Sequence, residues 1–179
     1  MVVEAVVVED HGQVQKFTLP PTWREENVKP RSSFDIVTLR KFCPPESSDV
    51  QLCFYYRGMP MGEPAAGKFQ LVLSGEPRLL AGVDIRTAEG ALGSLANPEE
   101  FEIASAETQN LNGRRVMRLT GRWLQIQYDT IHILLDADGS GTQVQEIYYA
   151  APSNFYDRYL PEIMQSLQSI VWNDICAET

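Results

Sequence analysis

The chain has 179 residues, 44% of them hydrophobic, and is therefore long enough to bury the core of a single domain. Its formal net charge is −9, and an acidic surface repels the phosphate groups of nucleic acids and anionic membranes. We therefore expect one domain, residues 1–179, that binds neither nucleic acid nor membrane.

The sequence favours a reduced, cytoplasmic environment. The segment Met1–Asp10 carries no basic leader and includes Glu4 within its apolar run, unlike a secretory signal peptide. No window approaches the ~18 uncharged apolar residues of a membrane-spanning helix. The cysteines are odd in number and unrelated in spacing, which suits free thiols better than disulfides: Cys43, Cys53 and Cys176. We expect a cytoplasmic protein without a membrane span.

The N-terminal part of the chain predicts β-strands. Val2–Val8 and Gln13–Leu19 are rich in β-forming residues and are joined by a turn at Gly12, which predicts a hairpin. Ser33–Phe42 and Asp49–Arg57 alternate in the manner of strands, and a proline-containing loop separates them.

The middle of the chain carries weaker patterns. Gly58–Pro64 is a turn-rich connector, and Ala65–Leu73 fits either a short helix or a strand. Thr87–Ala96 predicts a short helix that ends before Pro98. The secondary structure of residues 58–98 therefore stays open on the sequence alone.

A hairpin and a long β-rich segment follow. Phe101–Thr108 and Arg114–Trp123 flank an Asn-Gly pair, which is typical of a two-residue turn. Trp123–Asp136 is rich in β-forming residues, but its apolar positions change phase. A strand has a period of two, so this change predicts a bulge or bend near Asp129 and Thr130.

The last part of the chain predicts a strand, an acidic turn, a second strand and a helix. Asp136–Thr142 is dense in turn residues, and Gln143–Ala150 resumes as a strand. Over Ser153–Asn173 the apolar residues recur at helical spacing, with polar residues on the opposite side. A hairpin followed by a covering helix indicates an α+β fold: an antiparallel sheet flanked by helices, with a C-terminal amphipathic helix packed on the sheet.

Three segments carry a family resemblance: the strand and Pro-x-Trp motif of Phe17–Trp23, the hairpin around Asp136–Thr142, and Glu146–Phe155 with the helix that ends near Trp172. Together they resemble the fold group of the PsbP-like extrinsic proteins of photosystem II, a nuclear-transport factor that binds the GTPase Ran, and uncharacterised bacterial proteins. The resemblance implies an antiparallel sheet flanked by helices that acts as a binding or assembly module. Members with assigned roles bind other proteins, and some bind metal ions. No family binding residue maps onto a position of this sequence.

The acidic turn also matches the first half of a calcium-binding loop. Asp136, Asp138 and Ser140 stand at positions that supply oxygen ligands in such loops. The second half does not match, because Ile147 stands where a bidentate glutamate is needed and Glu146 comes one residue early. The alternative is a hairpin turn shaped by aspartate and glycine, which we favour, and we expect no metal or other cofactor.

The densest basic cluster of the chain consists of Arg114, Arg115, Arg118 and Arg122. In a strand, Arg114, Arg118 and Arg122 share one face, which would present a stripe to an acidic partner or a small anion. The alternative, which we favour, is cross-strand pairing with acidic residues of the neighbouring strand: Glu100, Glu102 and Glu107.

Catalytic signals are weak. The chain has two histidines, His11 and His132, and neither has a Cys, His or Glu at metal-ligand spacing. The sequence contains no nucleophile elbow, phosphate-binding loop or dinucleotide fingerprint. Aromatic residues, among them Tyr149 and Tyr156, crowd the approach to the final helix, mostly as core but in part as the lining of a groove.

We therefore predict a non-catalytic protein-binding or assembly factor whose partner is another protein. The candidate binding residues are Arg114, Arg118, Arg122, Tyr149 and Tyr156. The alternative is an enzyme or a small-ligand-binding protein with a pocket built from scattered polar residues. The sequence does not define the oligomeric state.

Overall fold

The computed structural model describes residues 7–26, 38–56, 63–92 and 97–174. The strands in these ranges are β1 (Val7–His11), β2 (Val14–Thr18), β3 (Arg24–Glu26), β4 (Thr38–Cys43), β5 (Gln51–Tyr56), β6 (Arg78–Leu79), β7 (Phe101–Leu111), β8 (Arg114–Trp123), β9 (Tyr128–Asp136), β10 (Val144–Pro152) and β11 (Val171–Trp172). The helices are α1 (Glu63–Ser74), α2 (Val83–Leu92) and α3 (Ser153–Gln168). Five predicted segments lie partly outside the described residues: Val2–Val8, Ser33–Phe42, Asp49–Arg57, Gly58–Pro64 and Thr87–Ala96.

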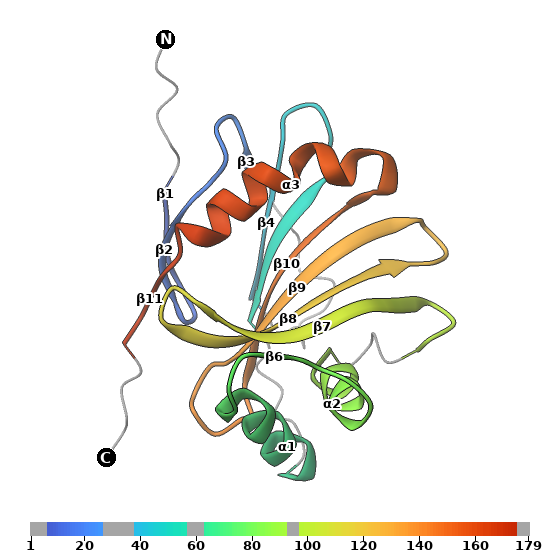
Figure 1. The fold of residues 1–179 in the computed structure, drawn as a ribbon. Coiled ribbons are helices and arrows are strands. Elements are labelled where there is room, and N and C mark those ends of the chain that lie inside the picture. The colour runs from blue at the N-terminus through green and yellow to red at the C-terminus, as the bar shows by residue number, and fades with distance from the viewer. Residues whose placement is uncertain (1–6, 27–37, 57–62, 93–96, 175–179) are drawn as a thin grey trace.

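The strands form two antiparallel sheets (Figure 1). The larger sheet has the order β3-β4-β5-β10-β9-β8-β7-β6, and the smaller has the order β1-β2-β11. Strand β11 follows α3 and pairs with β2, so the C-terminal part of the chain returns beside its N-terminal hairpin. The predicted α+β class is confirmed, since α3 packs on one face of the large sheet and α1 and α2 pack on the other.

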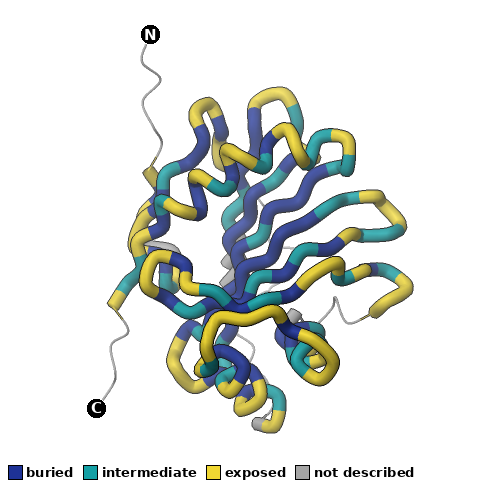
Figure 2. Tube along the Cα trace, viewed as in Figure 1, coloured by how far each residue is buried: buried dark blue, intermediate teal, exposed yellow. Residues whose placement is uncertain are grey.

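Both faces of the large sheet are buried, as the dark-blue central strands of Figure 2 show. Successive residues of a strand point to opposite faces, so Ile133 packs with α3 residues while Leu134 packs with residues of α1 and α2. The α3 side includes Phe54, Ile131, Ile147, Tyr149, Ile163 and Leu167, and the opposite side includes Phe69, Ala88, Met117, Leu119 and Val144. Burial on both faces explains why β10 is apolar at most positions and why β9 contains the consecutive apolar residues Ile133–Leu135.

The Pro-x-Trp motif forms a turn that anchors α3. Thr22 takes a positive φ of 74°, and the amide of Trp23 donates to the carbonyl of Pro20 at 3.2 Å. The Trp23 ring is buried and meets the ring of Tyr159 edge-on at 6.0 Å. Its indole Nε1 donates to Glu162 Oε2 at 3.3 Å. The motif therefore fixes the N-terminal hairpin against the covering helix.

The structure corrects the prediction of a single strand over Trp123–Asp136. Strand β8 ends at Trp123, residues 124–127 form a turn, and β9 begins at Tyr128. Gln127 has a positive φ of 55°, and its side-chain amide donates to the carbonyl of Leu124 at 2.6 Å. The phase change therefore comes from this turn and not from a bulge near Asp129 and Thr130. The register shift that the sheet does contain lies in β7, between Ile103 and Ser105.

Helix α3 ends at Gln168, five residues before the predicted end at Asn173. The side-chain amide of Asn112, in the β7–β8 turn, reaches three carbonyl oxygens at this helix end, and the chain then leaves as β11. The Ser169 hydroxyl also accepts a hydrogen bond from the amide of Thr18 at 2.8 Å. These contacts end the helix at Gln168, although apolar residues continue at helical spacing in the sequence beyond it.

The described residues between β5 and β7 include two helices, α1 and α2. Of the two alternatives for Ala65–Leu73, the helix is correct, and it belongs to α1. Helix α2 begins at Val83, four residues before the predicted start at Thr87. Asp84 in its first turn is favoured there by the helix dipole, and Gly82 immediately before it has a positive φ of 56°.

Candidate functional site

Helices α1 and α2 lie together on the sheet face opposite α3 (Figure 1). Residues of both helices line an open groove between them. The groove has a volume of 310 Å³ and is lined by Pro64, Ala65, Lys68, Val83, Arg86, Thr87 and Gly90. Apolar residues form most of this lining. The two cations, Lys68 and Arg86, come from different helices and therefore from opposite walls.

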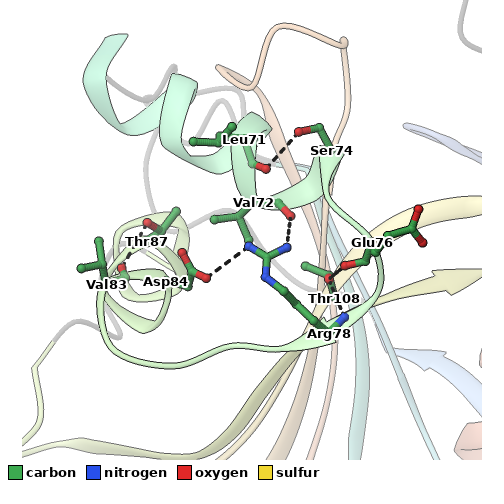
Figure 3. Close-up of polar contacts among 9 residues, drawn as sticks. All are labelled: Leu71, Val72, Ser74, Glu76, Arg78, Val83, Asp84, Thr87 and Thr108. Atoms are coloured by element: carbon green, nitrogen blue, oxygen red, sulfur yellow. Dashed lines mark hydrogen bonds and ion pairs between the residues drawn. The ribbon is translucent and has the colours of Figure 1, made fainter.

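Arg78 in β6 contacts both helices that form the groove: the last turn of α1 and the first turn of α2 (Figure 3). Its guanidinium lies 3.2 Å from Asp84 Oδ2 in the first turn of α2 and donates to the carbonyl of Val72 in the last turn of α1 at 3.5 Å. The backbone amide of Arg78 donates to the hydroxyl of buried Thr108 at 3.2 Å. A cation near the carbonyl end of α1 and an anion near the amide end of α2 are both favourable, so one arginine holds the groove together.

The chain segment that contains α1, β6 and the start of α2 carries three exposed large apolar side chains. Leu71 in α1 is 72% exposed, Leu79 in β6 is 75% exposed, and Val83 at the start of α2 is 59% exposed. Leu71 follows Lys68 by one helical turn, so the two residues are neighbours on the surface of α1. Single exposed apolar residues are ordinary, but three large ones within one short segment are typical of an interaction surface.

The groove is locally basic in an acidic protein. Neither Lys68 nor Arg86 forms an ion pair with another described residue, and no described acidic residue lines the groove. Six other basic side chains do form ion pairs: Arg40, Lys41, Arg78, Arg118, Arg122 and Arg158. The positive charge of the groove is therefore available to a partner.

The arginines of β8 share one face, as predicted, but most of their charge is already paired. Arg118 Nη1 lies 3.0 Å from Glu107 Oε1 on β7, which is the favoured cross-strand alternative. Arg122 makes a two-pronged contact with Asp129 on β9, in which Nη2 lies 3.1 Å from Oδ2. The predicted acidic strand thus supplies one partner, and the following strand supplies the other.

Arg114 lies apart from this pair. Its side chain is only 9% exposed, donates to Gln13 Oε1 at 2.9 Å, and lies over the ring of Trp172 with 5.7 Å between guanidinium carbon and ring centre. Burial lowers the pKa of Arg114. Arg114 therefore joins the two sheets and does not extend an exposed stripe.

The two candidate tyrosines pack beneath and within α3. Tyr149 is 1% exposed, and its hydroxyl donates to the carbonyl of Tyr156 at 2.8 Å. Their rings stack with centres 5.1 Å apart. Burial raises the pKa of Tyr149, and it raises that of Tyr156 to about 12. Tyr149 is a core residue with no surface for a partner, while Tyr156 is half-buried at the helix edge.

The acidic turn supports α1. The carboxylate of Asp136 accepts hydrogen bonds from the amides of Gly139 and Gly141 at 3.0 and 2.9 Å, and Asp138 accepts from the amide of Ser140 at 3.0 Å. Gln70 of α1 donates to the carbonyl of Gly139. The loop thus uses the three candidate metal ligands to shape itself, and it packs against the helix that forms one groove wall.

Strand pairing creates a polar cluster that sequence spacing does not reveal. His132 Nδ1 lies 2.7 Å from Glu146 Oε1, and its Nε2 lies 3.0 Å from Thr130 Oγ1. The Thr130 hydroxyl donates to the carbonyl of Gly121 at 3.2 Å, which links the cluster to β8. These three residues are at most 4% exposed, so the cluster is buried.

The two cysteines in the described residues are equally enclosed. Cys43 and Cys53 are buried free thiols, and burial raises the pKa of Cys53 to about 12, so it is not a thiolate at neutral pH. Across the described ranges, no three His, Cys, Asp or Glu side chains are grouped to hold a metal ion. None of the helices in those ranges is long and apolar enough to cross a membrane.

The groove itself was not found by sequence reasoning. Its walls come from the segment where helix and strand patterns were ambiguous, and its exposed apolar residues weaken the amphipathic signal that identifies a helix. The signal that could have identified the groove is a short stretch of an acidic chain in which Leu71, Leu79 and Val83 lie between two cations, Lys68 and Arg86. The His132–Glu146 contact required the register of the β9–β10 hairpin, which places Glu146 diagonally across from His132.

The elements that position these residues form a PsbP-like α+β fold. The solution structure of cyanobacterial PsbP (CyanoP) from Synechocystis is similar to this chain with a TM-score of 0.56 and 14% identity, and the match covers 97% of this chain and 95% of that one. The crystal structure of LpqN, involved in cell envelope biogenesis of Mycobacterium tuberculosis, is similar with a TM-score of 0.51 and 12% identity over 97% and 92% of the two chains. A Pseudomonas aeruginosa protein of unknown function has a TM-score of 0.46, with 12% identity over 94% and 96%.

No family model matches the sequence, and a search of curated proteins finds no match. At identities of 12–14% the structural likeness shows the fold alone. The PsbP-like part of the sequence resemblance is therefore confirmed as a fold. None of the three similar structures is a Ran-binding transport factor, so that part of the resemblance stays a prediction.

Proposed function

We propose that this protein is a non-catalytic accessory protein that binds another protein through the α1–α2 groove and the exposed apolar side chains beside it. The observation that carries the proposal is the gathering of Leu71, Leu79 and Val83 on one segment. A partner that covers them gains roughly 25 cal/mol for each Å² of apolar surface removed from water. The groove gives such a partner a shaped contact next to this surface.

The local architecture suits a docking surface. Arg78 ties α1 to α2, and the acidic turn packs on α1, so the groove is held by a rigid scaffold before a partner arrives. A preformed surface loses little conformational entropy on binding. By contrast, the most catalysis-like group, His132 with Glu146 and Thr130, is buried. We also propose that the protein acts in the cytoplasm, which buried free thiols at Cys43 and Cys53 support.

A site-specific crosslinking experiment tests this function. A photoreactive amino acid is introduced at Val83 in one variant and at Ile126 in another, because both side chains are 59% exposed and apolar. Ile126 lies in the β8–β9 turn, away from the groove lining. After illumination in the native host, crosslinked proteins are identified by mass spectrometry.

We expect a discrete partner from the Val83 variant and none from the Ile126 variant. Crosslinking that is equal at the two positions would reject the groove as the docking site. Reproducible turnover of a metabolite by the purified protein, lost on His132→Gln with the fold intact, would replace the proposal with the enzyme alternative.

A further inference from the structure

We propose that the partner segment that enters the α1–α2 groove is acidic and amphipathic: an apolar side chain fills the groove, and flanking carboxylates pair with Lys68 and Arg86. This inference rests on the proposed function and names the chemistry of its partner. It follows from the size of the groove, its charge and the glycine in its wall.

The size of the groove suits a side chain better than a cofactor. Its 310 Å³ lies at the lower end of the ~300–1,000 Å³ that is typical of small-molecule pockets. The apolar part of the lining comes from Pro64, Ala65, Val83 and Gly90. Such a shallow apolar site matches one or two apolar side chains presented by a larger surface.

The charge of the groove selects an acidic segment. Lys68 and Arg86 face each other across the groove from α1 and α2 without an ion partner among the described residues. Helix α2 has two acidic residues: Asp84 is paired with Arg78, and Glu89 lines a different pocket, together with Ile85 and Phe101. In a partner segment with carboxylates on both sides of an apolar anchor, one carboxylate would pair with Lys68 and another with Arg86. The apolar surroundings exclude water from these ion pairs and so strengthen them. A basic segment would meet two like charges.

Gly90 lets the partner approach closely. Glycine in a helix interior costs roughly 0.5–1 kcal/mol relative to alanine, so it calls for a structural reason. At Gly121 that reason is packing, because an added Cβ would overlap the ring of Phe101. At Gly90 an added Cβ would meet no atom within 4 Å, and the open space belongs to the groove. Gly67 on α1 also faces open space but does not line the groove, which makes it a matched control.

The test uses short fluorescent peptides as probes. The first carries leucines at helical spacing with glutamates between them, the second replaces the glutamates by lysines, and the third replaces the leucines by serines. Binding to the full chain is followed by fluorescence anisotropy at low and high salt. We expect the first peptide to bind at least about tenfold more tightly than either other peptide, and salt to weaken it.

Charge reversal gives the decisive variant. Lys68→Glu with Arg86→Glu should weaken the acidic peptide at least about tenfold and shift the preference to the lysine peptide. Lys16→Glu with Arg24→Glu makes the same change in net charge at exposed positions outside the groove lining, and it should leave binding unchanged. Gly90→Trp should block binding, whereas Gly67→Trp should not. Unchanged thermal unfolding of each variant confirms that the fold is intact.

The outcomes separate the two proposals. A partner captured at Val83 that binds the charge-reversed protein as well as the wild type would overturn the acidic-segment inference and leave the proposed function standing. Equal binding of the three peptides would overturn it as well. If Val83 captures only a second copy of this chain, the groove is a self-association site, and both proposals fall.

Discussion

Asn112 shows how a single side chain can join two distant elements. It occupies the β7–β8 turn with a positive φ of 50°, which asparagine tolerates well. Its Nδ2 lies 3.4, 3.0 and 2.7 Å from the carbonyl oxygens of Leu167, Gln168 and Ile170. The carbonyl of Leu167 also accepts from the amide of Ile170 at 3.3 Å, whereas those of Gln168 and Ile170 lie where the helix has ended, so the Asn112 amide acts as a cap from across the molecule.

Removing this amide should destabilise the protein without changing its core. We expect Asn112→Ala to lower the free energy of unfolding by about 1–3 kcal/mol, because it exposes the carbonyls and strains a non-glycine residue at positive φ. Asn112→Gly relieves the strain and should cost less. Asn112→Asp directs carboxylate oxygens at three carbonyl oxygens and should cost the most. Urea denaturation measures all three, and a different order of stability would reject the capping role.

The Asp129 carboxylate makes a pH-dependent contribution to the free energy of unfolding, and the direction of its pKa shift sets the sign. Burial raises its pKa, but hydrogen bonds from Arg122 and Ser153 outweigh this effect, and the pKa lies below its ordinary value. A carboxyl group whose pKa is lowered in the folded state stabilises the fold above its unfolded pKa, and this contribution disappears as the pH falls through the folded pKa. Arg122 is exposed, so the contribution near pH 7 should be at most about 1 kcal/mol.

We therefore expect Asp129→Asn to be slightly less stable than the wild type near neutral pH, and the difference to close as the pH falls below about 4. Urea unfolding at several pH values measures this difference. Asp157→Asn, which changes an exposed carboxylate on α3, serves as control and should give a much smaller difference. A difference at Asp129 that stays constant across the acid range would contradict the assignment.

At the scale of the elements, sequence reasoning succeeded where the local pattern and the tertiary structure agree. The Asn-Gly pair predicted the β7–β8 turn, and helical spacing predicted α3. It failed at residues 124–127, because Leu124 and Ile126 are β-forming residues placed in a turn. The turn is stabilised by contacts with residues distant in sequence, which local patterns do not predict. One of them is the hydrogen bond from the Ser153 amide to the carbonyl of Gln127, at 3.0 Å.

The acidic turn allows a direct test of its structural role. Calcium prefers six to eight oxygen ligands, and here the carboxylates of Asp136 and Asp138 already accept hydrogen bonds from the loop itself. We therefore expect millimolar calcium to leave Tm unchanged. A site saturated about a hundredfold above its Kd would add about 2.7 kcal/mol, which is a shift of several degrees. Such a shift, abolished by Asp136→Ala, would restore the metal hypothesis, with Glu146 as the next ligand to examine.

At the scale of the molecule, the large sheet lies between two hydrophobic cores and contributes side chains to both. Ile133 and Leu134 are neighbours in β9 yet belong to opposite cores. The sequence predicted the sheet and α3, but the apolar run Ile133–Leu135 in β9 does not say which residue faces which helix. Nor does it say that α1 and α2 leave a groove, because the register of eight strands and the packing of two helices set that geometry.

Two cores on one sheet should unfold together if the chain is a single domain. Trp23 reports on the α3 side, where it contacts Tyr159, and Trp123 reports on the opposite side, where it contacts Phe101. We expect variants that retain only one of these tryptophans, the others being changed to phenylalanine, to share one urea midpoint when followed by fluorescence.

Leu167→Ala extends this test across the sheet. Leu167 is 4% exposed and packs only in the α3-side core. Deleting its side chain should cost about 2–5 kcal/mol of unfolding free energy. In a cooperative domain this loss lowers the midpoints reported by Trp23 and Trp123 equally, although Trp123 lies on the face that the change does not touch. If only the Trp23 midpoint moves, α3 and its core unfold as a separate unit, and the groove on α1 and α2 could persist without them.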